Sequence, residues 1–240
     1  MSVGIFAAKI ALGPVLLPQA RWLRRTALRL PEAAGPRQGQ VGEGETVLRV
    51  LVVGDSAAAG VGVTDQTQAL TMQLAHALSD ALRGAIGWQL VAQSGINTAE
   101  CRALAAQANL QAADVVVTVL GVNDVSSQTT ASRFAQGLSL LWADLQQRTG
   151  AQRLVVCGVP PMHLFPAIPQ PLRWYLGRYA MWLDRAGQRW TEQERLGYCP
   201  VDWPADDGFV AADGFHPGAA LYPLWAQRLA GLIAGQRVPS

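Results

Sequence analysis

The sequence predicts a three-layer α/β/α fold, in which a parallel sheet of about five strands lies between two layers of helices. Strand-like and helix-like stretches alternate from residue 46 to the carboxyl end, as they do in chains built from right-handed βαβ crossovers. Two strand-like stretches, 48–53 and 114–120, are nearly continuous apolar runs, which is typical of strands buried on both faces. The 240 residues suit one such domain of about 200 residues plus an extension.

The expected elements follow one another in a simple order. After the strand at 48–53, Leu70, Leu74 and Leu78 recur at helical spacing. The remaining expected elements are a strand at 88–92, a helix at 99–111, a strand at 114–120, a helix at 134–148, a strand at 154–159, and helices at 174–195 and 219–234. The stretch 198–202 is compatible with a fifth strand.

The first 45 residues differ in composition from the rest, so we divide the chain into an apolar and basic segment at 1–30, a linker at 31–45 and a main domain at 46–240. Residues 1–20 are apolar but contain Lys9, Pro14 and Pro18 and no convincing cleavage site, so we expect no cleaved signal peptide. The uncharged run 10–20 is shorter than the roughly 20 residues that a spanning helix needs. The stretch 31–45 is rich in Pro, Gly and polar residues, as linkers are.

Residues 19–30 predict an amphipathic helix with an arginine-rich side. The apolar members are Trp22, Leu23, Ala27 and Leu30, and the basic members are Arg21, Arg24, Arg25 and Arg29. A helix of this kind suits an anionic membrane surface. We therefore expect a cytoplasmic protein with peripheral contact to the inner face of the membrane through 1–30; packing of this segment on the body or on a partner subunit is the alternative.

Ser56 is the candidate nucleophile, because Gly54-Asp55-Ser56 ends the first buried strand and ligands of open α/β sheets bind at the carboxyl ends of strands. A serine hydroxyl needs a base within hydrogen-bond reach, and His216 has the chemistry for it. Asp213, three residues earlier on the same tight turn, can hold the imidazole in the required tautomer. A turn cap is the alternative role for Asp213.

Two further polar blocks follow strands, namely Gly95 in Ser-Gly-Ile-Asn-Thr and Asn123 in Gly-Val-Asn-Asp. With these in place, the chain resembles the SGNH hydrolases of the GDSL esterase/lipase superfamily over residues 47–234. The resemblance implies a flavodoxin-like architecture and an oxyanion hole formed by the backbone N–H groups of Ser56 and Gly95 and the side-chain amide of Asn123. Ala57 departs from the family pattern by replacing its Leu, at a position that carries no catalytic atom.

Asp55 and Asp124 are interpreted as supporting residues, whose short carboxylates brace the loops that carry Ser56 and Asn123. The resemblance implies a serine esterase that hydrolyses short- to medium-chain carboxylic esters through an acyl-enzyme, with no cofactor and no metal. Lysophospholipase, thioesterase or carbohydrate deacetylase activity and a non-catalytic membrane-associated binding module are the alternatives. The apolar, proline-rich stretch 159–182 can line an acyl pocket, form a lid, or face lipid or a partner.

The overall composition excludes other classes. The chain is 50% hydrophobic and 15% charged with a formal net charge of +2, which is not the composition of a disordered protein. Arg21, Arg24, Arg25, Arg29 and Arg37 all lie in the first forty residues, and no basic patch with interleaved aromatic residues appears elsewhere. We therefore expect no nucleic-acid partner, and a small-molecule or lipid ester as the substrate.

Overall fold

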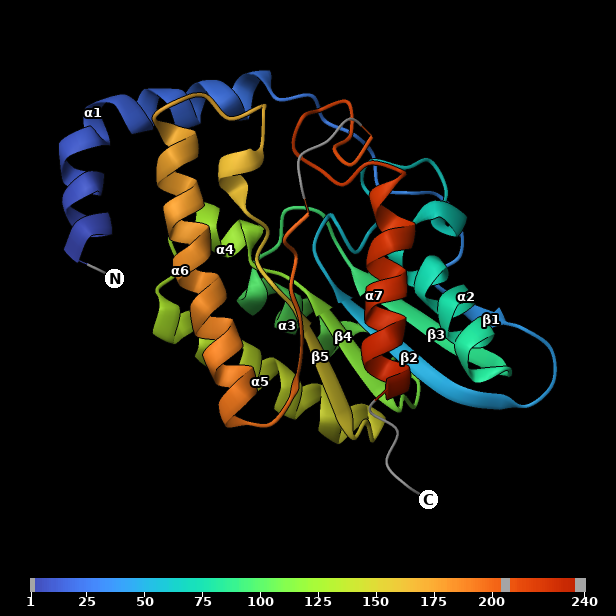
Figure 1. Ribbon diagram of the computed structural model, residues 1–240. Helices are drawn as coiled ribbons and strands as arrows, with labels where there is room; N and C mark the ends of the chain where they lie inside the picture. The colour runs from blue at the N-terminus through green and yellow to red at the C-terminus, as the bar shows by residue number, and fades with distance from the viewer. Residues whose placement is uncertain (1–2, 204–207, 236–240) are drawn as a thin grey trace.

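The computed structural model describes residues 3–203 and 208–235 and has a six-stranded sheet between two layers of helices (Figure 1). The strands are β1 (Gln38–Val41), β2 (Thr46–Gly54), β3 (Ala85–Ala92), β4 (Val115–Val119), β5 (Arg153–Cys157) and β6 (Gly197–Cys199). Their order across the sheet is β1-β3-β2-β4-β5-β6, and only the pairing of β1 with β3 is antiparallel. The five parallel strands have the flavodoxin-like order, which confirms the predicted fold class.

The helices divide between the two faces of the sheet. They are α1 (Val3–Thr26), α2 (Leu70–Leu82), α3 (Thr98–Gln107), α4 (Val122–Ser126), α5 (Ala131–Thr149), α6 (Leu172–Gln193) and α7 (Leu221–Gly235), with short 3-10 helices η1 (Gln66–Gln68) and η2 (Met162–Leu164). In Figure 1, α2 and α7 cover one face and α3, α5 and α6 cover the other. This is the three-layer arrangement that alternating elements predict.

Strand β2 shows how the two cores form. Leu51 and Val53 point into the core under α3, α5 and α6, whereas Val50 and Val52 point into the core under α2 and α7. All four side chains are 3% exposed or less. Because successive side chains of a strand alternate between faces, an uninterrupted apolar run serves two cores at once.

The segment 31–45 is not a free linker, so this part of the predicted domain division is wrong. It contains β1, which pairs with β3 at the edge of the sheet. Arg37 donates from Nη1 to the carbonyl of Ala92 at 2.6 Å, and the Glu32 carboxylate accepts from the backbone N–H of Ser94 at 2.6 Å. These long-range hydrogen bonds attach a polar, glycine-rich stretch to the carboxyl end of β3, and local composition does not reveal them.

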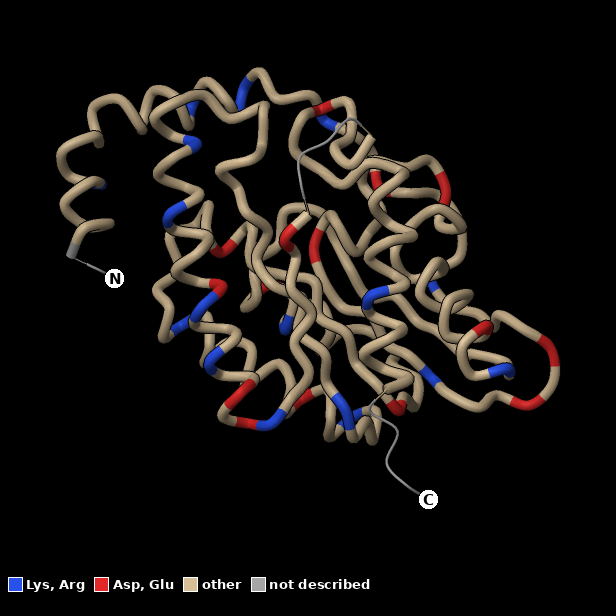
Figure 2. Tube along the Cα trace, viewed as in Figure 1, with Lys and Arg blue, Asp and Glu red and all other residues tan. Residues whose placement is uncertain are grey.

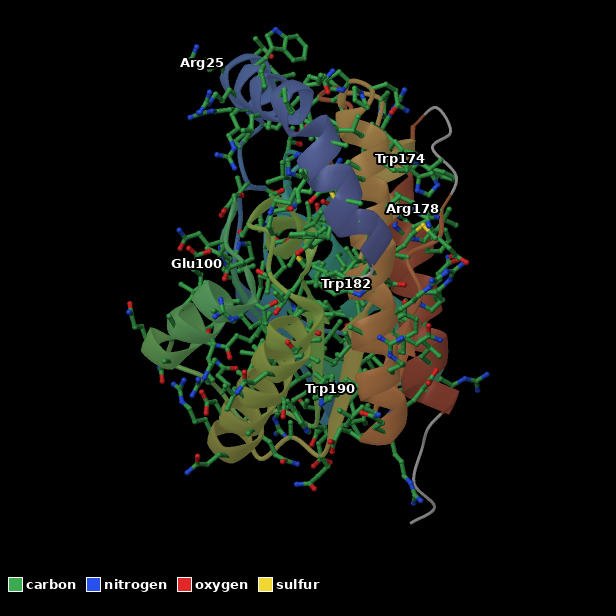
Figure 3. The ribbon with its side chains drawn as sticks, turned by 90° about the vertical axis from the view of Figure 1, so that its left-hand side faces the viewer. Arg25, Glu100, Trp174, Arg178, Trp182 and Trp190 are labelled. Carbon is green, nitrogen blue, oxygen red and sulfur yellow. The ribbon has the colours of Figure 1, made fainter. Side chains whose placement is uncertain are left out.

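The amino-terminal segment forms one long helix that packs on the body. Helix α1 continues through Pro14 and Pro18, and Figure 1 shows it bent, as proline inside a helix requires. Ile5 and Leu16 are buried against the core that includes α6. Figure 3 shows α1 lying along α6 on the side of Trp174 and Arg178. In the part of the chain that the structure describes, no helix combines the length and apolarity needed to cross a bilayer.

Candidate active site

The site lies where the order of the parallel strands reverses. Strand β2 is followed along the chain by its neighbour on one side, β3, and then by its neighbour on the other side, β4, which leaves a crevice at their carboxyl ends. Ser56 follows β2 by two residues, and Asn123 lies in α4 directly after β4. Gly54 allows this close approach, because a Cβ there would lie 2.4 Å from the carbonyl oxygen of Val119.

Ser56, His216 and Asp213 form a continuous hydrogen-bonded row. The Nε2 atom of His216 lies 3.0 Å from the hydroxyl oxygen of Ser56, and its Nδ1 atom lies 2.5 Å from Oδ2 of Asp213. The second carboxylate oxygen, Oδ1, accepts the backbone N–H groups of Phe215 and His216, both at 3.0 Å. The Asp213 carboxylate is therefore fixed by its own turn and orients the imidazole towards Ser56.

The electrostatics of Asp213 favour its charged form. Its side chain is only 3% exposed, and this burial raises the pKa. Hydrogen bonds from the His216 ring and from the two backbone N–H groups outweigh burial, so the pKa of Asp213 lies below its usual value. A carboxylate held ionised beside an imidazole stabilises the imidazolium that forms when histidine accepts a proton.

Gly95 and Asn123 line the same cavity as Ser56 and His216. Gly95 has a φ of +85°, a conformation that favours glycine, and a Cβ there would meet no atom within 4 Å. Its backbone conformation, rather than crowding around a Cβ, is therefore the reason for glycine at this position. Asn123 donates from Nδ2 to Oδ2 of Asp55 at 3.3 Å, which holds its amide beside the segment that carries Ser56.

Asp55 and Asp124, which we interpreted as supporting residues, are both buried, at 3% and 2% exposed. Asp55 accepts the N–H of Ala57 at 3.1 Å in addition to the Asn123 amide. Asp124 accepts both the N–H and the hydroxyl of Thr98, at 3.0 and 2.8 Å, and so joins α4 to the start of α3. Burial raises the pKa of Asp55 to about 7 and also raises the pKa of Asp124.

The raised pKa of Asp55 predicts a pH-dependent stability. The unfolded carboxyl titrates near 3.9 and the folded one near 7, so the stabilisation is fully present below about pH 4 and is lost as the pH rises through 7. The amide side chain of the Asp55→Asn variant does not titrate. The free energy of unfolding of this variant minus that of wild type should therefore be about 2 to 3 kcal/mol larger at pH 8 than at pH 5. Urea unfolding at both pH values measures this. Asp80→Asn, at an exposed position of α2, is the control, and a constant difference between wild type and Asp55→Asn would contradict the prediction.

Sequence reasoning missed two features that the structure brings to the site. Phe215 packs edge-on against Phe165 and against the His216 ring, with centroid distances of 5.0 and 5.1 Å, so it holds the imidazole from the side. Glu32 binds Ser94 next to Gly95 and pairs with Arg37. The sequence could have indicated the role of Phe215, because this residue lies between Asp213 and His216. Nothing in the sequence around Glu32 indicated its contact with Ser94.

A serine hydroxyl in line with a histidine and a carboxylate, at the carboxyl edge of a parallel sheet, has the geometry of the serine hydrolases. The chain belongs to the GDSL-like lipase/acylhydrolase family, whose model matches residues 52–224. It is a carboxylic ester hydrolase. A search of curated protein sequences found no match.

Solved structures with the same fold include several esterases. TesA is 24% identical, with a TM-score of 0.59, over 78% of this chain and 99% of that one. The psychrotrophic esterase EstA from Pseudoalteromonas sp. is 20% identical, with a TM-score of 0.58, over 78% and 97%. Est24, a carbohydrate acetylesterase from Sinorhizobium meliloti, is 19% identical, with a TM-score of 0.57, over 79% and 100%. At these identities the likeness shows the fold.

Proposed function

We propose that this protein is a serine esterase in which Ser56 is the nucleophile, His216 the general base and Asp213 its orienting carboxylate. The observation that carries the proposal is the row of short contacts from Ser56 through His216 to Asp213, at 3.0 and 2.5 Å. With the Nδ1 proton directed at Asp213, Nε2 is free to accept the hydroxyl proton of Ser56. The assignment needs no cofactor and no metal.

The reaction follows from these contacts. The Ser56 oxygen attacks the ester carbonyl while His216 takes its proton, and the negative charge that develops on the carbonyl oxygen is stabilised by the N–H groups of Ser56 and Gly95 and by the Asn123 amide. His216 then returns the proton to the departing alcohol, which leaves an acyl group on Ser56. A water molecule, activated by the same histidine, releases the carboxylic acid.

A small apolar cavity beside Ser56 supports an acyl group of short to medium length. Its volume is about 80 Å³. Phe165 of the stretch 159–182 lines it, together with Trp203 and Trp225. The stretch therefore supports the acyl-pocket interpretation. The walls at the end of β4 and in α7 are buried, with Val119, Leu120 and Trp225 at 4% exposed or less, and we propose that long acyl chains are excluded.

An ester panel tests this function. Release of p-nitrophenol from acyl esters graded from acetate to decanoate should give the highest kcat/KM between acetate and hexanoate and a fall of at least tenfold by decanoate. A pocket of this size has room for few methylene groups, so a longer chain meets packed side chains. Absence of ester hydrolysis across the whole panel would count against the proposed activity, and a maximum at decanoate would count against the assigned acyl pocket.

We further propose that α1 contacts an anionic membrane, at the cytoplasmic face. Phe6, Ile10, Leu17 and Trp22 are each more than half exposed along α1. Residues 3–26 carry four basic residues and no acidic one, and Figure 2 shows only basic positions along α1. Figure 3 shows Arg25 at the end of α1. Exposed apolar side chains beside arginines are the features that bind a helix to anionic lipid.

Single substitutions test the membrane contact. One basic residue near the surface contributes about 1 kcal/mol to binding of an anionic membrane, so Arg25→Glu should lower partitioning onto phosphatidylglycerol vesicles by at least tenfold. Trp22→Ser should also lower it, whereas Arg189→Glu, at an exposed position of α6, should have little effect. Sedimentation with vesicles measures the bound fraction. Equal binding by Arg25→Glu, Trp22→Ser and wild type would refute the contact.

A further inference from the structure

A second and much larger cavity also reaches Ser56. Its volume is about 950 Å³, and its walls include Ser56, Gly95, Asn123 and His216. The apolar part of the remaining lining comes from α1 and from the region where α6 begins: Leu16, Ala20, Leu23, Ile168, Leu172 and Leu176. Helix α1 therefore forms part of the wall of a cavity that reaches Ser56 and His216.

Helix α1 is attached at this place by specific contacts. The Gln19 side chain donates from Nε2 to the carbonyl of Gln170 at 2.6 Å and accepts the N–H of Leu172 at 3.1 Å, so it caps the start of α6. Leu16 is 6% exposed and Leu172 4% exposed. The part of α1 around Leu16 and Gln19 is therefore held in place as a wall of the cavity by specific contacts.

The wall is an addition to the family fold. The family model begins at residue 52, well after α1, and the solved structures named above are matched almost in full by less than four fifths of this chain. The volume lies at the upper end of the range of about 300 to 1,000 Å³ that is typical of small-molecule sites. Helix α1 also contributes three charged residues to the lining, Lys9, Arg21 and Arg24. They are exposed and mark the opening of the cavity to solvent.

We propose that the cavity between α1 and α6 binds a long hydrocarbon chain on the alcohol side of the ester, so that the substrate is a short-chain acyl ester of a lipid alcohol. This inference rests on the proposed function, because it uses Ser56 as the point where the two cavities meet. The acyl pocket, at about 80 Å³, is far smaller than this cavity, at about 950 Å³. The larger cavity supplies apolar walls next to the same serine, and its opening lies on the helix that we assign to the membrane.

A pair of isomeric esters tests which side carries the chain. Octyl acetate and ethyl octanoate have the same atoms and differ only in the position of the ester bond, and ethyl acetate is the short reference. Each buried methylene contributes about fourfold in affinity, so kcat/KM for octyl acetate should exceed that for ethyl acetate and for ethyl octanoate by at least tenfold. Acid release at constant pH measures all three. Preference for ethyl octanoate, or no preference for octyl acetate, would overturn the proposal.

Filling the cavity from α1 supplies the structural test. Ala20→Trp should lower the ratio of kcat/KM for octyl acetate over ethyl acetate by at least fivefold, because the indole occupies the space of the chain. Gly13→Phe, from another turn of the same wall, should also lower it, since a Cβ at Gly13 meets nothing within 4 Å. Ala11→Trp is the matched control, because Ala11 is an exposed residue of α1 outside the cavity lining. If Ala20→Trp and Gly13→Phe both kept the wild-type ratio of kcat/KM for octyl acetate over ethyl acetate, the proposed chain-binding site would be refuted.

A binding measurement separates this inference from the proposed activity. The fluorescent fatty acid 11-(dansylamino)undecanoate should bind the Ser56→Ala protein and be displaced by 1-dodecanol, and Ala20→Trp introduced into that protein should weaken the displacement at least fivefold. If no ester is hydrolysed but this displacement occurs, the esterase assignment fails and the chain site stands. If esters are hydrolysed through Ser56 but 1-dodecanol does not bind, the chain site fails and the esterase assignment stands.

Discussion

Ser56→Ala should lower kcat for p-nitrophenyl acetate by at least 10⁴-fold, and His216→Ala should have a comparable effect. Among the described residues, Nε2 of His216 is the only base that forms a hydrogen bond with the Ser56 hydroxyl. Ser56 without His216, or His216 without Ser56, should therefore contribute little to catalysis. For the same reason the double variant should be little worse than either single one. Initial rates with purified proteins, corrected for spontaneous hydrolysis, measure all three.

Thermal unfolding of these variants supplies the control. Ser56 and His216 are partly exposed, so neither substitution leaves a large cavity in the core, and the loss of activity should occur without loss of fold. More than a tenth of wild-type turnover in Ser56→Ala would rule out the nucleophile. Strictly multiplicative losses in the double variant would show that the two residues do not act together.

Asp213→Asn should lower kcat by about 10³- to 10⁴-fold, the second largest effect that we expect. The substitution preserves shape but replaces a charged acceptor of the Nδ1 proton by a neutral amide, which favours the wrong imidazole tautomer and stabilises imidazolium less. The lowered pKa of Asp213 has the same origin, namely the favourable interaction of its charge with His216 and the turn. Rates of acyl transfer at pH 8 measure the loss.

The turn itself provides a comparison for Asp213. Oδ1 accepts two backbone N–H groups, and the amide oxygen of Asn can accept them as well, so a residue with only a capping role would keep both stability and activity when changed to Asn. Asp65→Asn, at the N-cap of η1, where Oδ1 accepts the N–H of Thr67, is a control for exchanging a capping carboxylate for an amide. If Asp213→Asn kept more than a third of wild-type kcat, Asp213 would be a turn cap and His216 would need another partner.

Much of the candidate site could be predicted because its residues lie at strand ends that the apolar pattern marks clearly. The apolar runs that end before Ser56, Gly95 and Asn123 form strands buried on both faces of the sheet. Such strands are apolar at almost every position, so they can be recognised from their own sequence. Asp213 and His216 are three residues apart on one turn, a spacing at which the turn alone brings their side chains into contact. Chemistry that depends on local spacing is readable from a sequence.

The parts that could not be predicted depend on contacts between distant segments. Strand β1 is a polar stretch whose pairing with β3 arises from edge hydrogen bonds, and the Glu32 contact with Ser94 spans 62 positions. The sequence predicted an apolar stretch at 1–20 and an amphipathic helix at 19–30, and Pro14 and Pro18 usually interrupt helices. Packing against α6 supports one bent helix across both prolines, which no local pattern shows.

Active-site labelling with a fluorophosphonate tests the central claim most directly. The reagent should add one phosphonyl group to the wild-type protein, mass spectrometry of peptides should place it on Ser56, and the group should be absent from Ser56→Ala. His216→Ala should label at least 100-fold more slowly, because the hydroxyl then lacks its base. Labelling of another residue, or equal labelling of wild type and Ser56→Ala, would contradict the assignment of Ser56 as the nucleophile.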